Sequence, residues 1–386
     1  MLKLSGRISQ TNKVADGVYS VSTKSYLPKV LAQKKAYVLK GNINEDINNF
    51  AFFIITESNK KLVHLIDASK KYILVSDDFS YIDNQDIIRI TNDGSRLGTI
   101  FRASSHQNSF LVTEQCNHYC LMCSQPPKKI DDSYLIEEIA KAIPLIPKDT
   151  EEIGFTGGEP TLFGERFIHL LELTKNYLPN TAVHILTNGR KFIEHDFVSN
   201  YARINHHDMM VGIPLYSDDP QLHDYIVQAK GAFDETILGI LNLKKLKQKV
   251  EIRIVIHKQS IKRLVELCQY ITRNLLFVDH VALMGLEMMG FTRANLDDLW
   301  IDQFEYKHIL SEAVGVLEKS DMNISIYNHQ LCLVNEDIMP YYKKSISDWK
   351  NEFAPECLEC TKVSECGGFF SSGVKHGYSK NLAPFK

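Results

Sequence analysis

Seven of the eight cysteines fall into two groups whose spacing suits metal or cluster binding. The first group, Cys116, Cys120 and Cys123, lies within a short loop. Thiolates are the usual ligands of iron–sulfur clusters, and three of them leave the fourth iron of a cubane open to another ligand. His118 lies inside the same loop and offers a fourth ligand, so the spacing alone also fits zinc. The spacing alone therefore does not distinguish an iron–sulfur cluster from a zinc site.

The second group, Cys332, Cys357, Cys360 and Cys366, lies near the end of the chain. Four thiolates can close an iron–sulfur cluster fully, and they also suit tetrahedral zinc. The tail around them has few apolar runs, and a metal staple would compensate for its small core. The remaining cysteine, Cys268, lies among apolar residues, and we expect it to be a buried small side chain.

The elements that must position these cysteines follow an α/β pattern. From about residue 109, apolar runs of strand length alternate with longer segments of helical period. Six such strands predict a partial (β/α)6 TIM-like barrel, in which chemistry collects at the carboxyl ends of the strands. The first cysteine group follows the first of these strands. The predicted strands are Phe110–Thr113, Ile153–Thr156, Val183–Thr187, Met210–Leu215, Val250–Ile256 and Val278–Met284, and the helices cover roughly 132–146, 164–177, 191–202, 232–247 and 260–274.

The flanking regions predict two further domains. Short apolar runs separated by turn residues indicate a β-rich N-terminal domain, and a helix and a short strand lead into the cysteine-bearing tail. We therefore expect a β-rich domain over 1–107, the partial barrel over 108–295 and a small cysteine-rich Fe–S domain over 296–386. The strands expected outside the barrel are Ala51–Ile55, Leu62–Ile66, Tyr72–Val75, a hairpin of Ile87–Ile90 with Leu97–Phe101, and Asn323–Tyr327, which follows a helix over about 302–319.

Composition narrows the possible partners. The 386 residues are 44% hydrophobic and 24% charged, and the formal net charge of -3 gives no basic surplus for nucleic acid or anionic lipid. No segment approaches the roughly 20 apolar residues that span a bilayer, and the N-terminus has no apolar signal region. We expect a cytoplasmic protein with neither nucleic acid nor a membrane as partner. Cytoplasmic thiols stay reduced, which favours metal binding over disulfides.

Two motifs resemble the radical S-adenosylmethionine (SAM) superfamily. Residues 116–123, Cys-Asn-His-Tyr-Cys-Leu-Met-Cys, resemble its CxxxCxxC signature, and Gly157-Gly158-Glu159-Pro resembles its GGEP motif. The resemblance implies that Cys116, Cys120 and Cys123 hold a catalytic [4Fe–4S] cluster whose fourth iron binds SAM. In the family, SAM is cleaved reductively to methionine and a 5′-deoxyadenosyl radical. Gly157 and Gly158 would let the backbone approach SAM, and Glu159 would accept hydrogen bonds from its ammonium group.

Four further residues are weaker candidates for SAM binding. Asn188 resembles a polar residue of the family after the third strand, although a helix cap fits it equally well. Ser217 is a candidate for the ribose, Arg253 for the SAM carboxylate and Met122 for the adenine. Relatives carry a serine and a basic residue at two positions where this chain has Pro214 and Val227.

The tail resembles an auxiliary-cluster domain of the twitch or SPASM type, which implies a second [4Fe–4S] cluster on Cys332, Cys357, Cys360 and Cys366. Longer stretches resemble the HxsC-type maturases of the His-Xaa-Ser peptide system. That resemblance implies a ribosomally made precursor peptide as substrate, a second radical SAM maturase as partner, and a reductant such as flavodoxin or ferredoxin. The stretches that carry it are 111–127, 279–295 and 366–372.

Two other functions remain open from the sequence. A radical SAM enzyme can act on a small molecule, or on another protein residue such as the Cys or Ser of a sulfatase. Outside the enzymes, the chain fits a zinc-stapled binding protein, because both cysteine groups also suit zinc. We further expect the β-rich N-terminal domain to help hold a peptide, on its position in the chain alone.

Overall fold

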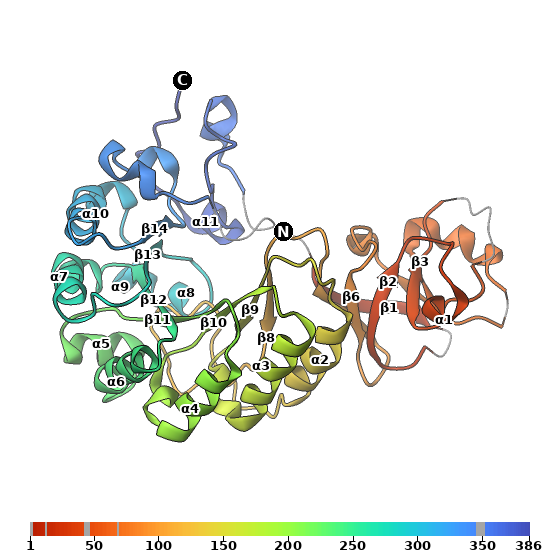
Figure 1. Cartoon of the computed structure of the whole chain (residues 1–386). Coiled ribbons are helices and arrows are strands. Elements are labelled where there is room, and N and C mark those ends of the chain that lie inside the picture. The colour runs from red at the N-terminus through yellow and green to blue at the C-terminus, as the bar shows by residue number, and fades with distance from the viewer. Residues whose placement is uncertain (1–2, 12–13, 42–46, 68, 345–351) are drawn as a thin grey trace. The chain divides into compact units, whose positions relative to one another are not determined.

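The computed structural model describes residues 3–11, 14–41, 47–67, 69–344 and 352–386 (Figure 1). They form two compact units, and the chain passes between the units more than once. The boundaries expected at residues 107 and 295 stay a prediction. The first unit comprises Met1–Phe110, Ser133–Ile153 and Leu170–Thr181, and the second comprises Leu111–Asp132, Gly154–His169 and Ala182–Lys386.

A closed β-barrel forms most of the first unit, with the strand order β1-β5-β4-β3-β2-β6-β7. Strand β1 pairs antiparallel with both β5 and β7, and this closes the barrel. Closure pairs the strand edges that an open sheet would expose. The predicted hairpin is confirmed as β6 and β7. The strands are β1 (Ser5–Thr11), β2 (Gly17–Ser22), β3 (Lys35–Val38), β4 (Phe52–Thr56), β5 (Tyr72–Val75), β6 (Ile87–Ile90) and β7 (Arg96–Phe101).

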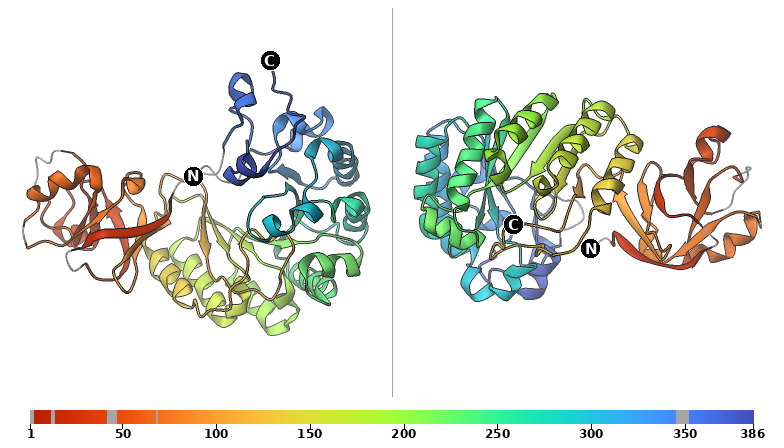
Figure 2. Two further views of the ribbon diagram at one scale, coloured as in Figure 1. Left: turned by 180° about the vertical axis from the view of Figure 1, so that it is seen from behind. Right: turned by 90° about the horizontal axis from the view of Figure 1, so that it is seen from below.

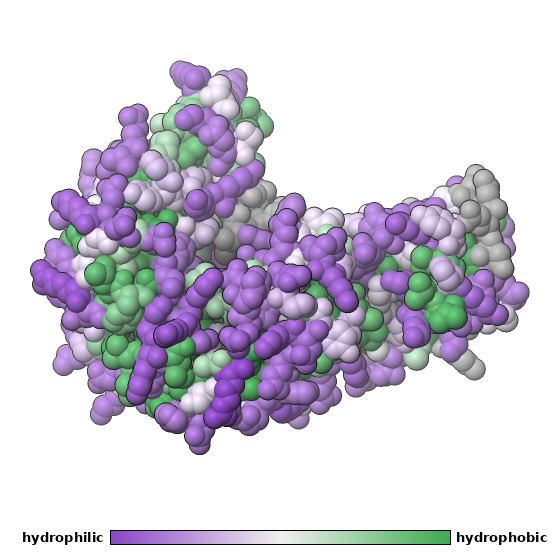
Figure 3. All heavy atoms as spheres, viewed as in Figure 1, coloured by the Kyte–Doolittle hydropathy of each residue, from purple (hydrophilic) through white to green (hydrophobic). Residues whose placement is uncertain are grey.

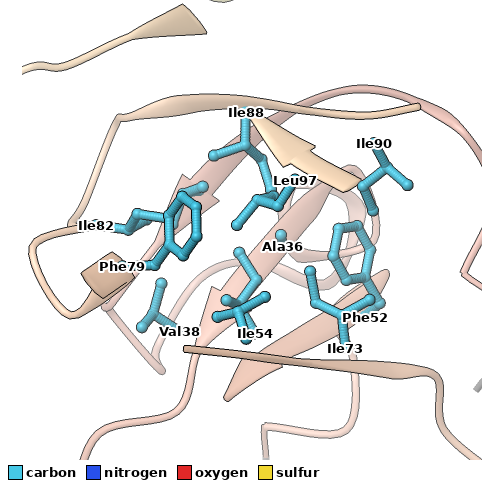
Figure 4. Close-up of a cluster of buried hydrophobic side chains, with 12 residues drawn as sticks. Ala36, Val38, Phe52, Ile54, Ile73, Phe79, Ile82, Ile88, Ile90 and Leu97 are labelled. Carbon is cyan, nitrogen blue, oxygen red and sulfur yellow. The ribbon is translucent and has the colours of Figure 1, made fainter. Parts of the chain in front are cut away.

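Strands β3 to β5 are apolar on both faces. Alternate residues such as Val38, Ile54 and Ile73 point into the barrel, where Figure 4 shows them packed around Leu97. The opposite faces of the same strands pack against residues that include Leu62 and Ile66. The strand predicted at Leu62–Ile66 is therefore wrong. Its apolar residues cover the outside of the barrel from a 3-10 helix, η1 (Glu57–Leu65), near the short helix α1 (Lys29–Ala32) and the turn η2 (Asp77–Phe79).

Helix α2 (Tyr134–Ala142) belongs to the barrel unit although it follows the first cysteine group in the chain. Its buried face presents Ile136 and Ile139, and its Glu138 carboxylate lies 2.6 Å from the Arg89 guanidinium of β6. Both charged side chains are mostly buried. Removing only residues 1–107 would therefore expose an apolar helix face and leave Glu138 without its ion-pair partner.

The parallel strands predicted from the sequence form a seven-stranded sheet in the order β14-β13-β12-β11-β10-β9-β8. Strands β10 to β14 are parallel, and each pairs with its neighbour in the chain. The six predicted strands are confirmed within a few residues, and the strand predicted near 323–327 adds a seventh. The strands are β8 (Asn108–Leu111), β9 (Glu152–Thr156), β10 (Ala182–Leu186), β11 (Met209–Pro214), β12 (Lys249–Ile256), β13 (His280–Gly285) and β14 (Ile324–Tyr327).

Helices α4, α6, α7 and α10 lie along one face of strands β10 to β14 (Figures 1 and 2). The predicted helices are confirmed within a few residues, and the sequence missed α5, which begins at Pro220 after the N-cap Asp219. The helices are α3 (Glu165–Tyr177), α4 (His195–Ile204), α5 (Pro220–Val227), α6 (Ala232–Lys245), α7 (Leu264–Asn274), α8 (Phe291–Ala294), α9 (Leu296–Leu299), α10 (Gln303–Glu318) and α11 (Ser371–His376), with 3-10 turns η3 (Ile143–Leu145), η4 (Pro160–Phe163), η5 (Arg190–Ile193), η6 (Ile261–Arg263), η7 (Leu331–Leu333), η8 (Glu336–Tyr341) and η9 (Pro355–Glu359).

In the ranges that the structure describes, no helix is both long and apolar enough to span a bilayer. The face drawn in Figure 3 is mostly hydrophilic, and its apolar residues are scattered among charged ones.

A buried polar cluster joins four strands of the sheet. Glu251 of β12 is 3% exposed, and its carboxylate contacts Arg253 at 2.7 Å and His280 of β13 at 2.6 Å. His280 also lies 2.9 Å from the hydroxyl of Ser325 on β14, and His184 of β10 lies 3.4 Å from the carboxylate. Burial alone would raise the pKa of Glu251, but the hydrogen bonds of the two histidines and the charge of Arg253 hold it below its usual value.

We expect Glu251→Gln to lower the free energy of unfolding of the second unit by about 3 kcal/mol at pH 7, because it leaves the partly buried Arg253 without its counter-ion. The folded pKa of Glu251 lies below the unfolded value of about 4.3, so its stabilising contribution is complete above that pH. The contribution declines as the pH falls toward the folded pKa, so the difference between wild type and variant should narrow at pH 4. Urea titration followed by tryptophan fluorescence measures it, with the exposed Glu266→Gln as control.

Candidate functional site

The first cysteine group lies in a loop, residues 116–123, that we call the cysteine loop. Backbone hydrogen bonds fix its middle to the end of α5. Tyr119 N donates to Val227 O at 3.1 Å, and Leu121 N donates to Ile226 O at 2.9 Å. The end of helix α5 therefore holds the backbone of the loop that carries the three cysteines. Val227 takes part through its backbone carbonyl group, which accepts one of the two hydrogen bonds.

The segment after β13 holds the other end of the cysteine loop. Phe291 N donates to Cys123 O at 2.8 Å, and the Thr292 hydroxyl donates to Met122 O at 3.0 Å. Asn295 adds a third hydrogen bond, from its side-chain amide to Leu121 O at 2.9 Å. The Thr292 and Asn295 side chains thus give hydrogen-bond partners to two backbone carbonyl groups of the cysteine loop, and buried carbonyl groups need such partners. The sequence offered them only as part of the stretch 279–295, without a role for any of them.

Gly157 and Gly158 follow β9 and lie against the chain that leads into the cysteine loop. Gly158 N donates to Thr113 O at 2.7 Å, and Glu159 N donates to Gln115 O at 2.8 Å. A Cβ atom built on Gly157 would lie 2.5 Å from Thr113 O, and one on Gly158 would lie 2.1 Å from Gln115 O. Both positions therefore require glycine for contact between two backbones, in addition to any approach to a ligand.

The carboxylate of Glu159 is 1% exposed and is already hydrogen-bonded within the protein. One oxygen accepts from Thr161 N at 3.0 Å and from the hydroxyls of Thr161 and Thr187, both at 2.6 Å. The other accepts from Asn188 N at 2.6 Å. Burial raises the pKa of Glu159, and these hydrogen bonds oppose that shift. The side chain thus ties the loop after β9 to the end of β10, and only the second oxygen has capacity left for another donor.

Asn188 joins the same assembly. Its side-chain amide donates to the Asn117 side chain in the cysteine loop at 2.6 Å, and its carbonyl oxygen accepts from Arg190 N at 3.1 Å. The second contact lies at the start of the 3-10 turn η5, whose N-cap residue is Gly189, and the N-cap of helix α4 is Glu194, so Asn188 is not the helix cap that was its alternative role. The first contact brings Asn188 to the cysteine loop, together with Gly157, Gly158 and Glu159.

The other candidates for SAM binding are engaged elsewhere. The hydroxyl of Ser217 is buried and accepts from Asp219 N at 3.0 Å in the turn before α5. Arg253 pairs with Glu251 and also donates to the Met284 sulfur at 3.2 Å. Met122 is buried in a cluster that includes Tyr216 and Val227, beside Cys120. An apolar residue suits position 227 because that cluster is a core.

The three cysteines of the cysteine loop are partly buried. Burial raises the pKa of Cys116 to about 12 and raises the pKa of Cys120 and Cys123 as well. Repulsion between neighbouring thiolates adds to the shift of Cys120. Thiols in such a setting ionise when a metal cation supplies the opposite charge. The donor set therefore fits an iron–sulfur cluster held by three thiolates.

His118 was the fourth ligand of the zinc alternative. It is 3% exposed, its Nδ1 lies 4.0 Å from the Cys120 sulfur, and burial lowers its pKa to about 3, which keeps the imidazole neutral. In the part of the chain that the structure describes, no three His, Cys, Asp or Glu side chains converge as ligands of one metal ion. This finding applies to both cysteine groups alike, and His118 packs inside the loop with its ring beside the Cys120 sulfur.

The four tail cysteines line one pocket. Cys366 accepts backbone hydrogen bonds from Leu331 N and Gly368 N, both at 3.4 Å, so its sulfur lies against the turn that carries Cys332. Burial raises the pKa of Cys332 and Cys357, and the charge of Cys366 adds to both shifts. The structure therefore brings the distant Cys332 to the other three. The pocket is lined by Gln330, Leu331, Cys332, Phe353, Cys357, Cys360, Lys362, Val363, Cys366, Leu382, Pro384 and Phe385.

Cys268 lies apart from both groups. It is buried on helix α7, among Leu264, Leu267 and Ile271. Its expected role as a small core side chain agrees with this position.

Comparison with known proteins identifies the domain that carries the cysteine loop. Residues 110–271 match the model of the radical SAM superfamily. This range includes the cysteine loop, the Gly157–Glu159 turn and Asn188. No curated protein matches the chain significantly.

Several solved structures are distantly similar. SuiB of Streptococcus suis is 18% identical with a TM-score of 0.45, over 61% of this chain and 51% of SuiB. The structure described as native anSMEcpe with bound AdoMet is 16% identical with a TM-score of 0.44, over 56% of this chain and 62% of that one. The coproporphyrinogen III oxidase HemN of Escherichia coli, a radical SAM enzyme, is 15% identical with a TM-score of 0.44, over 55% and 52%. The chain spans about half the length of SuiB.

Proposed function

We propose a ribosomally made peptide as the substrate of this chain, which carries a radical SAM domain in residues 110–271 and is an enzyme of that class. The family implies a [4Fe–4S] cluster and SAM. When bound, these groups supply an electron and a 5′-deoxyadenosyl radical that abstracts hydrogen from a substrate. Cys116, Cys120 and Cys123 would hold the cluster, and we interpret the sheet as a partial β/α barrel with the site at the carboxyl ends of its strands.

One observation carries the proposal beyond SAM cleavage. The four tail cysteines, which come from two separate segments, line one pocket in the same compact unit as the cysteine loop. Four thiolates can complete a second cluster without leaving an open iron. We infer an auxiliary [4Fe–4S] cluster at this pocket and a peptide maturase of the His-Xaa-Ser type, served by a flavodoxin- or ferredoxin-like reductant and by a second radical SAM maturase.

Anaerobic reconstitution with iron and sulfide tests the enzyme and its clusters together. Two clusters require about eight irons per chain, and incubation with dithionite and SAM should then yield 5′-deoxyadenosine. Mass spectrometry of peptides encoded beside the gene, treated with and without the enzyme, identifies the substrate. A colourless protein that retains zinc would support the zinc-stapled binding protein instead, and turnover of a small molecule or of a sulfatase-type residue would replace the peptide substrate.

We expect Cys357→Ala to lower the iron content below about eight per chain, by up to about four, because one iron of the second cluster loses its protein ligand, whereas the cysteine loop leaves that position to SAM. SAM cleavage by the cysteine loop should persist in this variant, since its ligands are separate residues. Iron analysis and 5′-deoxyadenosine formation measure the two effects independently. An unchanged iron content, with zinc lost instead, would assign the tail pocket to zinc.

We also infer that the β-barrel helps to hold the peptide. Exposed apolar side chains near α1, with Tyr26 70% and Val30 68% exposed, support a contact surface there. Because α2 packs in the same unit, deletion of the barrel would damage the rest of the chain. Peptide affinity should instead be measured in Tyr26→Ser/Val30→Ser, with Tyr225→Ser, an exposed tyrosine of α5, as control. Equal affinities in all three proteins would contradict this role.

A further inference from the structure

A second pocket lies in the same compact unit between the segment after β13 and the start of the tail. Its cavity volume is about 60 Å³, and further space beside it is open to solvent. It is lined by Ile256, Leu286, Met288, Trp300, Ile301, Gln303, Tyr306, Asn328, Gln330, Gly367, Gly368, Phe369, Phe370, Ser372, Gly373, Gly377, Tyr378 and Ser379.

The pocket adjoins the pocket of the tail cysteines, and the segment that lines it continues along the chain to a contact with the cysteine loop. Leu286 and Met288 line it, and three residues further along the chain Phe291 donates to Cys123 O in the cysteine loop. Gln330 lines both this pocket and the one formed by the tail cysteines, and it donates from its side chain to Gly368 O at 3.0 Å. A molecule in this pocket would therefore lie beside the pocket of the tail cysteines.

The eighteen lining residues that the structure describes include no charged side chain, and five of them are aromatic. Transfer of an unpaired charge into such a site is strongly unfavourable. SAM carries an ammonium, a carboxylate and a sulfonium group, so it does not fit here. The lining suits an uncharged, apolar or aromatic group.

Among the residues that the structure describes, two buried polar atoms of the lining have no hydrogen-bond partner. Several other polar groups are satisfied internally: Gln303 bonds to the backbone of Asn328 and Gln330, and the Tyr306 hydroxyl contacts His329 at 2.9 Å. The exceptions are Asn328 Oδ1 and the hydroxyl of Ser372, a residue only 7% exposed. Buried polar atoms without partners are unfavourable by about 1–3 kcal/mol each, so a ligand that satisfies them gains affinity. An acceptor and a hydroxyl donor match the N–H and C=O of one peptide unit.

We propose that this pocket binds one uncharged residue of the substrate peptide, its side chain among the aromatic rings and its backbone amide at Asn328 and Ser372. Both polar atoms are enclosed by the protein, so binding requires the Asn328 and Ser372 side chains to turn toward the ligand. The inference rests on the proposed peptide substrate and specifies which part of it is recognised. It assigns specificity to neutral residues and excludes acidic and basic ones at this position.

The test uses N-acetyl-L-phenylalanine amide as a neutral probe of the reconstituted full-length protein. The chain has two tryptophans, so Trp349→Phe leaves Trp300 of the pocket as the only tryptophan signal. We expect Trp300 fluorescence and saturation-transfer NMR to report binding with a Kd on the order of 1 mM, as suits a fragment of this size. N-acetyl-L-phenylalanine, which carries a carboxylate, should bind more than about tenfold more weakly.

Two glycines of the chain provide a matched pair of variants. A Cβ atom on Gly373 of α11 would meet only Phe369 atoms at 3.8 and 3.9 Å, so Gly373→Leu fills the pocket without a backbone clash. Gly315 of α10 lies outside the pocket with open space around it, and Gly315→Leu is the control. We expect Gly373→Leu to abolish probe binding and Gly315→Leu to leave it unchanged. Ser372→Ala should weaken binding about fivefold through the lost hydrogen bond, and the exposed Ser364→Ala should not.

Failure of the probe to bind the wild type, equal binding of the charged probe, or unchanged binding in Gly373→Leu would overturn the assignment. These measurements need no radical chemistry. Absence of 5′-deoxyadenosine from the reconstituted wild type would instead contradict the proposed enzyme function. The result of the probe-binding measurement would not be affected by that outcome.

Discussion

Cys120→Ala should abolish formation of 5′-deoxyadenosine from SAM, with a loss of more than about 100-fold, since changes even to partners of metal ligands lower activity 10- to 100-fold. The cysteine loop supplies three thiolates, and removal of one leaves two protein ligands for a cluster that needs at least three. The loop backbone should persist, because its anchors at Val227 and Ile226 do not involve the Cys120 side chain. We therefore expect an intact fold with about four irons fewer per chain.

Cys268→Ala is the matched control for this prediction. It also removes one buried thiol, but from α7, where Cys268 packs among apolar residues. Iron content and SAM cleavage should stay at the wild-type level. Anaerobic iron analysis, circular dichroism and quantification of 5′-deoxyadenosine distinguish the two variants. Wild-type cleavage by Cys120→Ala would show that this cysteine does not hold the reactive cluster.

Gly158→Ala should damage the site as severely through the backbone alone. The added methyl group would lie 2.1 Å from Gln115 O and 3.0 Å from the Cβ of Cys116. One of the two chains must move, and the hydrogen bonds from Gly158 N to Thr113 O and from Glu159 N to Gln115 O would then lengthen or break. We expect a loss of about 2–4 kcal/mol in the free energy of unfolding of the second unit, together with incomplete loading of the first cluster.

The control for this prediction is Gly315→Ala. Among the described residues, no atom beyond the local backbone of the helix lies within 4 Å of a Cβ at Gly315, which is in the interior of helix α10. Alanine should be neutral there or stabilise the helix by up to about 1 kcal/mol. Urea unfolding and iron content after reconstitution report both variants. Full cluster loading and wild-type stability in Gly158→Ala would contradict the prediction. They would show that the backbone at Gly158 can move away from the backbone at Gln115 without loss of the site.

The strands of the second unit could be predicted from local patterns because their apolar residues recur at a fixed period. Val183 and Ile185, for example, are both buried on β10. The same reasoning failed at Leu62–Ile66. Those residues are apolar because they cover the outside of the barrel, and a short apolar run does not distinguish this from a strand. Helix α5 was missed because His223 is part of its buried face, although Asp219 and Pro220 are recognisable start signals.

The candidate site, like the fold, could be predicted from the sequence only in part. The cysteines and the Gly157–Glu159 turn could be named from their order and spacing, since each motif is continuous in sequence. The partners of Glu159 could not, because Thr187 and Asn188 reach it from another strand. The same holds for Thr292 and Asn295, whose hydrogen bonds to the cysteine loop depend on a turn at Gly290 with a positive φ of 55°. Contacts between distant segments are set by the fold, and no local pattern records them.

The two compact units are interleaved along the chain, and this constrains their assembly during translation. The barrel strands end at Phe101, but the same unit includes α2 and residues up to Thr181. A nascent chain that has exposed only the barrel still lacks the helix whose Ile136 and Ile139 pack in that unit. Its apolar surface stays uncovered until the ribosome has released the cysteine loop and α2 as well. The first unit should therefore complete its folding only after the first cluster ligands have emerged, so that cluster insertion and barrel completion overlap in time.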